Sequence, residues 1–418
     1  MLNGRVNKTK YRTYLFMSNS PSPSAAPLFR SFFQGGFECS SQVNHERRVD
    51  QLRDTGHDIW PKQDYERLQS LGIQTARDGV RWHRIETAPY KYDWSSVLPM
   101  VRTARDTNTQ VIWDLCHYGW PDDLDVFSPQ FLDRFGAFAG AFAYVLRSEG
   151  DTTPLFAPVN EISYLSWAAG HVAHVRPFER DKGMILKAQL AQAAGRAIEA
   201  VWQVSPLARI IHPEPAIHVH APVPATDYEL KMAQGYSKSI FEGWDMVAGR
   251  LCPEFEGQER YLDVLGVNYY PHNQWVFSHE PYHPSQAVGR DHPRYHPFRL
   301  ILADIWERYR RPLFIAETGS DGDDRVSWLR YLCHEVRAAM EAGVPIEGIC
   351  LYPIVNFPAW DDRAHLHNGL WDYPADSETG ERETYVPLLR ELKRQMRLFD
   401  EFQAGTQPMQ KNVPPNTG

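Results

Sequence analysis

The chain has 418 residues, a formal net charge of -8 at pH 7 and 13% aromatic residues, the composition of an ordinary globular protein. Both signs of charge are interspersed without a basic stripe, which argues against a nucleic-acid partner. No stretch is apolar enough to span a bilayer and the N-terminus has no signal-peptide pattern, so we expect a cytoplasmic protein with no membrane partner. The five scattered cysteines predict neither a disulfide framework nor a zinc knuckle.

Residues 1–28 and 401–418 are expected to be flexible tails, because their Ser/Pro-rich or polar composition cannot build a core. Between them, over residues 29–400, short apolar runs alternate with longer amphipathic segments. The expected strands are 31–37, 73–80, 110–116, 155–160, 208–213, 262–270, 312–318 and 346–353. This α/β alternation predicts a single (β/α)8 TIM barrel, with loop insertions after the fourth and sixth strands, including the His-rich segment 279–297.

Two glutamates stand at the ends of expected strands on opposite sides of this barrel. In such a fold the active site lies at the carboxyl ends of the strands, where Glu161 ends the fourth strand and Glu317 the seventh. Glycoside hydrolysis needs two carboxyl groups across one pocket, one protonated and one either ionised for attack or activating a water. Their separation decides between retention and inversion, and the residues alone leave both outcomes open.

Short motifs at six strand ends occur in a fixed order. They are Phe32 to Gly35 with Gln42 seven residues later, Arg77 followed by Trp82 and Arg84, His117 with Pro121, Asn160-Glu161, Asn268-Tyr269-Tyr270, and Glu317-Thr318-Gly319. Together they resemble glycoside hydrolases of clan A, most closely family 1, the β-glucosidase and β-galactosidase group. The resemblance runs from about residue 32 to residue 371.

The resemblance implies a retaining β-glycosidase that acts on a small carbohydrate without a cofactor. Glu161 would be the general acid/base and Glu317 the nucleophile, kept ionised by Arg77 and hydrogen-bonded by Tyr270. Gln42, His117 and Asn160 would bind sugar hydroxyls. Neither the sugar nor the oligomeric state follows from the sequence.

The eighth strand departs from the family pattern in "LYPIVNFPAWDD". Asn356 and Phe357 are retained, and Trp360 replaces a tryptophan with one residue inserted, so Asn356 and Trp360 are expected at the substrate. The glutamate that holds the outer sugar hydroxyls in the family is absent, its place taken by Pro358 or Ala359. Sugar specificity therefore cannot be carried over.

The fifth strand adds "HPEPAIHVH", with His212, Glu214, His218 and His220. These residue types could bind a metal, but no spacing of a fourth ligand supports this, so we expect no metal and place Glu214 and a histidine in the sugar pocket. Three alternatives remain: a transglycosylase that uses the same two glutamates, a catalytically silent sugar-binding barrel, and a metal-dependent hydrolase using the histidines.

Overall fold

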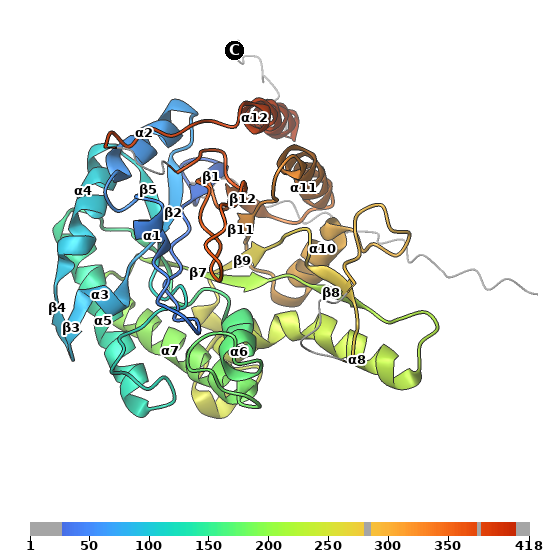
Figure 1. The fold of residues 1–418 in the computed structure, drawn as a ribbon, viewed down its shortest axis with the longest axis horizontal. Helices are drawn as coiled ribbons and strands as arrows, with labels where there is room; N and C mark the ends of the chain where they lie inside the picture. Colours follow the sequence, from blue (N-terminus) through green and yellow to red (C-terminus); the bar gives the residue numbers. More distant parts are fainter. Residues whose placement is uncertain (1–26, 280–285, 374–377, 407–418) are drawn as a thin grey trace, which may run out of the picture.

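The computed structural model describes residues 27–279, 286–373 and 378–406. Eight parallel strands close into a barrel in the order β1-β12-β11-β9-β7-β6-β5-β2 (Figure 1). The barrel strands are β1 (Phe33–Gly36), β2 (Thr75–Gly79), β5 (Gln110–Asp114), β6 (Leu155–Ala157), β7 (Arg209–Pro215), β9 (Val264–Asn268), β11 (Leu313–Thr318) and β12 (Ile346–Leu351). The predicted (β/α)8 TIM barrel is confirmed.

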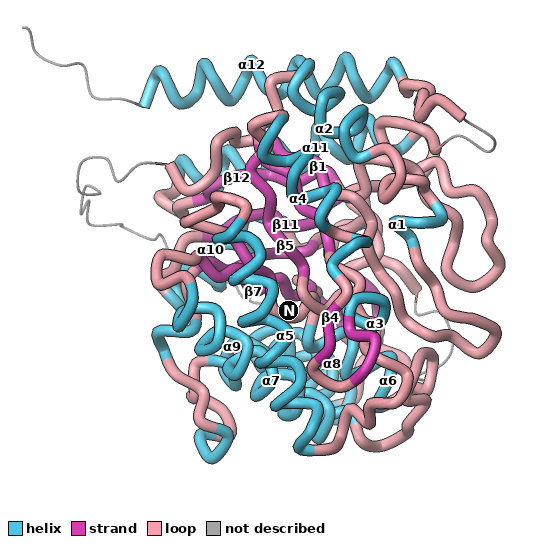
Figure 2. The backbone as a smooth tube through the Cα atoms, turned by 90° about the vertical axis from the view of Figure 1, so that its left-hand side faces the viewer, coloured by secondary structure: helices cyan, strands magenta, loops and turns pink. Residues whose placement is uncertain are grey.

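Helices surround these strands on the outside of the barrel (Figure 2). They are α1 (Gln51–Asp54), α2 (Pro61–Ser70), α3 (Trp82–Ile85), α4 (Leu98–Asp106), α5 (Pro129–Ser148), α6 (Ile162–Gly170), α7 (Gly183–Val204), α8 (Asp227–Lys238), α9 (Glu242–Val247), α10 (Phe298–Tyr309), α11 (Asp324–Glu341) and α12 (Val386–Thr406). Two small sheets add β3 (Glu86–Ala88) with β4 (Lys91–Tyr92), and β8 (His218–His220) with β10 (Gln274–Val276). No helix of the described residues has the length and apolarity needed to cross a membrane.

The barrel strands are buried on both faces, which is why they read as short apolar runs in the sequence. The barrel interior holds its own apolar cluster, which includes Ile112, Ile211 and Phe314. Phe29, which precedes the first strand, packs on Phe314 at a ring-centroid distance of 4.7 Å. These apolar side chains fill the amino-terminal end of the barrel, and the polar side chains lie at the carboxyl ends of the strands.

Most barrel strands are shorter at one or both ends than the runs expected from the sequence, and three segments extend beyond their expected boundaries. Strand β7 continues to Pro215, so Glu214 lies within it and not in a loop. Helix α12 continues to Thr406, past the expected boundary at residue 400. Leu28, expected in the tail, packs against the interior cluster. Residues 1–26 and 407–418 of the expected tails, and 280–285 of the His-rich insertion, lie outside the described residues.

Candidate active site

Glu161 lies at the junction between β6 and α6. Its backbone has φ 46° and ψ 65°, a left-handed conformation that residues with a side chain seldom adopt and that clusters at functional sites. Oε2 of Glu161 accepts a hydrogen bond of 2.7 Å from the Tyr118 hydroxyl, and Oε1 accepts one of 2.9 Å from the Asn268 amide. Burial and the charge of Glu317 raise the pKa of Glu161 to about 7. This side chain can therefore hold its proton near neutral pH.

Glu317 lies near the carboxyl end of β11, where it has a different environment. Its Oε1 accepts a hydrogen bond of 2.7 Å from Arg77, and its Oε2 accepts one of 2.9 Å from the Tyr270 hydroxyl. The guanidinium and the phenol hydroxyl each bind one oxygen and so fix the orientation of this carboxyl group. Asn268, which bonds Glu161, is the partner of Glu317 in the register between β9 and β11. The two glutamates thus meet at one end of the barrel in contrasting surroundings.

Arg77 connects the strands at this end of the barrel. Its side chain is fully buried, and Nε donates to Asp114 at 3.1 Å while Nη2 donates to Asn160 at 2.7 Å. With the bond to Glu317, one guanidinium fixes groups from β5, the segment after β6, and β11. The placement expected for Arg77 and Tyr270, beside Glu317, is what the structure has.

His117 lies between Asn160 and Asp114. Because the Asn160 oxygen accepts from Arg77, the amide nitrogen faces Nε2 of His117, at 3.0 Å. Nδ1 of His117 lies 3.2 Å from Asp114, so the neutral ring carries its proton on Nδ1. Burial lowers the pKa of His117, but Asp114 and Glu38 outweigh this effect and the pKa lies above its ordinary value. His117 and Asn160 therefore belong to the same network as the two glutamates.

Gln42 and Trp360 carry polar atoms without a protein partner. Gln42 is 1% exposed, and neither of its amide atoms has a hydrogen-bond partner among the described residues. Trp360 packs on Tyr118 and Tyr164 at ring-centroid distances of 6.0 and 6.4 Å, and its buried indole nitrogen also lacks a partner within the described chain. Since Tyr118 bonds Glu161, Trp360 lies on the Glu161 side of the site. Unsatisfied buried polar groups of this kind are costly unless a ligand or water completes them.

Asn356 is not brought to this network. Its side-chain oxygen accepts a hydrogen bond of 2.6 Å from the backbone nitrogen of Gly369, and its own backbone nitrogen donates to Trp371. These bonds fasten two passes of the chain after β12 to each other. The expectation that Asn356 contacts substrate has no support in its contacts, which fit a structural role.

The polar residues of the segment His212 to His220, in β7 and β8, make their contacts outside the network of the two glutamates. Glu214 is buried and accepts hydrogen bonds from the Ser163 backbone, and Nε2 of His212 lies 2.9 Å from the Tyr261 carbonyl. His218 stacks on His296 at 4.2 Å, and Nε2 of His220 lies 3.1 Å from the Gln274 side chain. These contacts give no support to the expectation that Glu214 and a histidine line the sugar pocket.

Two groups of described residues have metal-ligand geometry, and neither contains a fifth-strand residue. One joins Cys39, Asp114 and His117, and the other joins His365, His367 and Asp372. In the first group Arg77 already lies 2.8 Å from Asp114, and a cation beside this guanidinium would be repelled.

Several residues of the site escaped the sequence-based assignment. Tyr118 directly follows His117, and Asn268 begins the Asn-Tyr-Tyr motif, yet only their neighbours were assigned roles. Tyr352 lies under Arg77 with its ring centroid 5.1 Å from the guanidinium carbon. All three lie at or shortly after the end of a barrel strand, a position that marks them as candidates without showing which side chain reaches a carboxylate.

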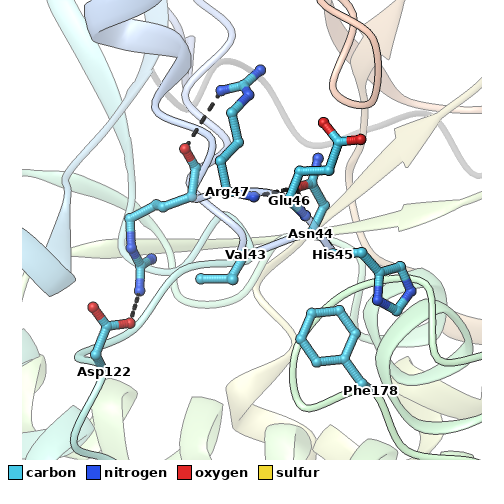
Figure 3. Close-up of a pocket in the computed structure, with 8 residues that line it drawn as sticks. Val43, Asn44, His45, Glu46, Arg47, Asp122 and Phe178 are labelled. Atoms are coloured by element: carbon cyan, nitrogen blue, oxygen red, sulfur yellow. Dashed lines mark hydrogen bonds and ion pairs between the residues drawn. The ribbon is translucent and has the colours of Figure 1, made fainter.

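A cavity of about 400 Å³ lies on the loop that follows Gln42 (Figure 3). It is lined by Val43, Asn44, His45, Glu46, Arg47, Arg48, Asp122 and Phe178. Asn44 donates from its side chain to the Trp360 carbonyl at 2.8 Å, so the cavity adjoins the rim of the site. Neither Glu161 nor Glu317 lines this cavity. The network around these two glutamates therefore lies deeper in the barrel.

No protein-family model and no curated protein sequence matches the chain. Among solved structures, a family 1 β-glucosidase from Thermotoga maritima superposes with a TM-score of 0.71 at 14% identity, covering 89% of this chain and 98% of that one. The AHE enzyme from Alicyclobacillus herbarius gives a TM-score of 0.70 at 16% identity, covering 90% and 100%.

A β-glucosidase from Thermotoga maritima in complex with glucoimidazole also matches, with a TM-score of 0.67 at 16% identity over 82% of this chain and 87% of that one. Identities this low establish a likeness of fold. The chain has the barrel fold of family 1 β-glucosidases.

Proposed function

We propose that the chain is a retaining β-glycosidase that hydrolyses the O-glycosidic bonds of small β-glycosides by double displacement. One observation carries the proposal: two carboxyl groups at one barrel end have opposite surroundings. Glu161 has a pKa raised to about 7 by burial and by Glu317, whereas Glu317 is paired with the guanidinium of Arg77. Pairs of carboxyl groups with such contrasting surroundings divide the roles of acid and nucleophile.

The first step joins the sugar to Glu317. The carboxylate of Glu317 forms a bond to the anomeric carbon while the bond to the leaving oxygen breaks, and Glu161 gives its proton to that oxygen. Arg77 and Tyr270 hold the two oxygens of Glu317 and fix its approach.

The second step releases the sugar. Glu161, now ionised, takes a proton from water, whose oxygen bonds to the anomeric carbon as the ester bond to Glu317 breaks. Glycosylation removes the negative charge of Glu317, which lowers the cost of ionising Glu161 for this role. The fold's neighbours are β-glucosidases by name, which supports a β-glycoside as substrate.

The test is a screen of 4-nitrophenyl β-glycosides followed by the Glu317→Ala variant on the best substrate. We expect the variant to lose activity by at least about 10³-fold, the scale of losing a nucleophile, and azide to restore part of it. The product should be the α-glycosyl azide, since azide would enter from the face that Glu317 occupied. Glu46→Ala, which removes an exposed carboxylate on the rim loop, is the matched control and should keep full activity. A wild-type product of inverted configuration would contradict the proposal.

A further inference from the structure

We propose that Glu38 is a specificity-determining residue which, with Gln42, binds a pair of adjacent free hydroxyl groups on the sugar, away from the anomeric carbon. This inference rests on the proposed function and names the groups by which the same site selects its substrate. The proposed reaction uses Glu161 and Glu317, and gives Glu38 no part.

Glu38 follows strand β1 and faces the network around His117. Its side chain is buried, and Oε1 accepts a hydrogen bond of 2.9 Å from the Ser40 backbone and lies 3.9 Å from Nε2 of His117. Electrostatic interaction with Glu317 also reaches this carboxyl group and, after burial, contributes to a raised pKa of Glu38. Glu38 therefore lies within range of the reacting groups.

Glu38 has no guanidinium or ammonium group at contact distance among the described residues. Asp114 and Glu317, two other buried carboxylates at this end of the barrel, both contact the guanidinium of Arg77. Glu38 has only the imidazole of His117, beyond hydrogen-bond distance. A buried carboxylate without a cation in contact costs stability unless donors from a ligand or water complete its hydrogen bonds. Sugar hydroxyls are donors of this kind.

Gln42 supplies a second, independent observation. It is buried, and both atoms of its amide lack a partner among the described residues. The segment between Glu38 and Gln42 runs beside His117, because the Ser41 nitrogen donates to the His117 carbonyl at 3.0 Å. A carboxylate accepts two hydroxyl hydrogens, and an amide both donates and accepts. The pair can therefore bind two neighbouring hydroxyl groups with complementary directions.

The residues after the eighth strand, β12, do not supply a buried carboxylate for these sugar hydroxyl groups. Asn356 is engaged by Gly369, and the Pro358 carbonyl accepts from Gln51. The carboxylate of Asp361 is exposed, with its side chain 67% accessible. Among the described residues after β12, none thus places a buried carboxylate at the site, while β1 does so through Glu38.

The experiment combines variants of Glu38 with substrates that lack one hydroxyl. Glu38→Ala, the isosteric Glu38→Gln and the control Glu46→Gln are each assayed on the best aryl β-glycoside and on its 3-, 4- and 6-deoxy analogues. Thermal unfolding of every variant checks folding, and Glu38→Gln keeps the test decisive if the alanine variant does not fold.

One hydrogen bond to a charged group corresponds to about 10- to 150-fold in kcat/KM. We expect a loss of this size for Glu38→Ala on the intact glycoside, a smaller one for Glu38→Gln, and none for Glu46→Gln. On the analogue that lacks the contacted hydroxyl, the Glu38 variants should lose at most about 3-fold relative to wild type, since the interaction is already gone. Equal losses on the intact and all deoxy substrates would overturn the inference.

Failure of the proposed function would give a different result from failure of the Glu38 inference. If wild type cleaves none of the glycosides, titration calorimetry with the free monosaccharides still tests Glu38. Binding to wild type that weakens at least about 10-fold in Glu38→Gln supports the inference. Absence of binding to wild type, or equal binding to both proteins, overturns it.

Discussion

Nη1 of Arg77 lies 2.7 Å from Glu317, and Nη2 of the same guanidinium lies 2.7 Å from the side-chain oxygen of Asn160, the neighbour of Glu161. One cation thus ties the two halves of the candidate site together. Asp114 completes its surroundings, and all these groups are buried.

Arg77→Met should therefore destabilise the fold as well as the site. The substitution leaves Asp114 and Glu317 as buried charges without a cation, and removing one partner of a buried pair typically costs about 3–5 kcal/mol. Urea unfolding at pH 7 measures the loss. Arg102→Met is the matched control, since Arg102 pairs with Glu149 at the surface and should cost far less. Equal losses in the two variants would contradict the role given to Arg77.

Glu161→Ala should affect substrates according to their leaving groups. A 2,4-dinitrophenolate leaves without protonation, so its glycoside should lose little rate in the first step, whereas an alkyl glycoside should lose about 10²–10⁴-fold, the usual contribution of a general acid. Steady-state kcat/KM on both substrates measures the difference, with Glu46→Ala as the control. The same loss on both substrates would remove Glu161 from the role of acid.

The barrel was predictable because its eight strands are buried on both faces and read as short apolar runs. The glutamates were predictable because the fold places strand ends at one pocket. Partners such as Tyr118 and Asn268 were not assigned, since which strand-end side chain reaches a carboxylate depends on register and loop path. Asn356 illustrates the reverse case: its place after a strand is the same, but the chain turns it toward Gly369.

The fifth strand shows a second limit of the sequence. The spacing of His212, Glu214 and His218 does not show which of these side chains face the barrel interior. The structure buries Glu214 against helix α6, where the Ser163 backbone donates to it. Local pattern therefore located the polar residues, but the packing of α6 decided what they do.

Tyr118→Phe should shift the pH dependence of the reaction. Glu161 must hold its proton for the first step, so kcat/KM should fall as pH rises through the pKa of about 7. The Tyr118 hydroxyl donates to the carboxylate and favours its ionised form, lowering this pKa. Without the hydroxyl the pKa rises, and the alkaline limb of the pH–rate profile should move up by about 1 unit. Tyr164→Phe is the control, since the Tyr164 ring packs at a tilt against Tyr118 with a centroid distance of 5.4 Å. A limb that moves down or stays in the Tyr118 variant would contradict the assignment.

Glu214→Gln should change how stability depends on pH. Burial is the main cause that raises the pKa of Glu214 to about 8, from its ordinary value of 4.5. Between these two values the unfolded chain has lost the proton that the folded protein keeps, so the free energy of unfolding of wild type falls as pH rises from 4.5 to 8. A shift of this size corresponds to up to about 5 kcal/mol, and glutamine lacks the ionisation that causes it.

The free energy of unfolding of Glu214→Gln relative to wild type should therefore increase across this window and level off above it. Urea titrations at several pH values measure the trend. Glu149→Gln, at a half-buried carboxylate paired with Arg102, is the control and should not reproduce it. Parallel pH curves for wild type and Glu214→Gln would mean that Glu214 is already ionised in the folded protein. Its contact with the Ser163 backbone would then be that of a carboxylate at the start of helix α6, where the helix dipole favours negative charge.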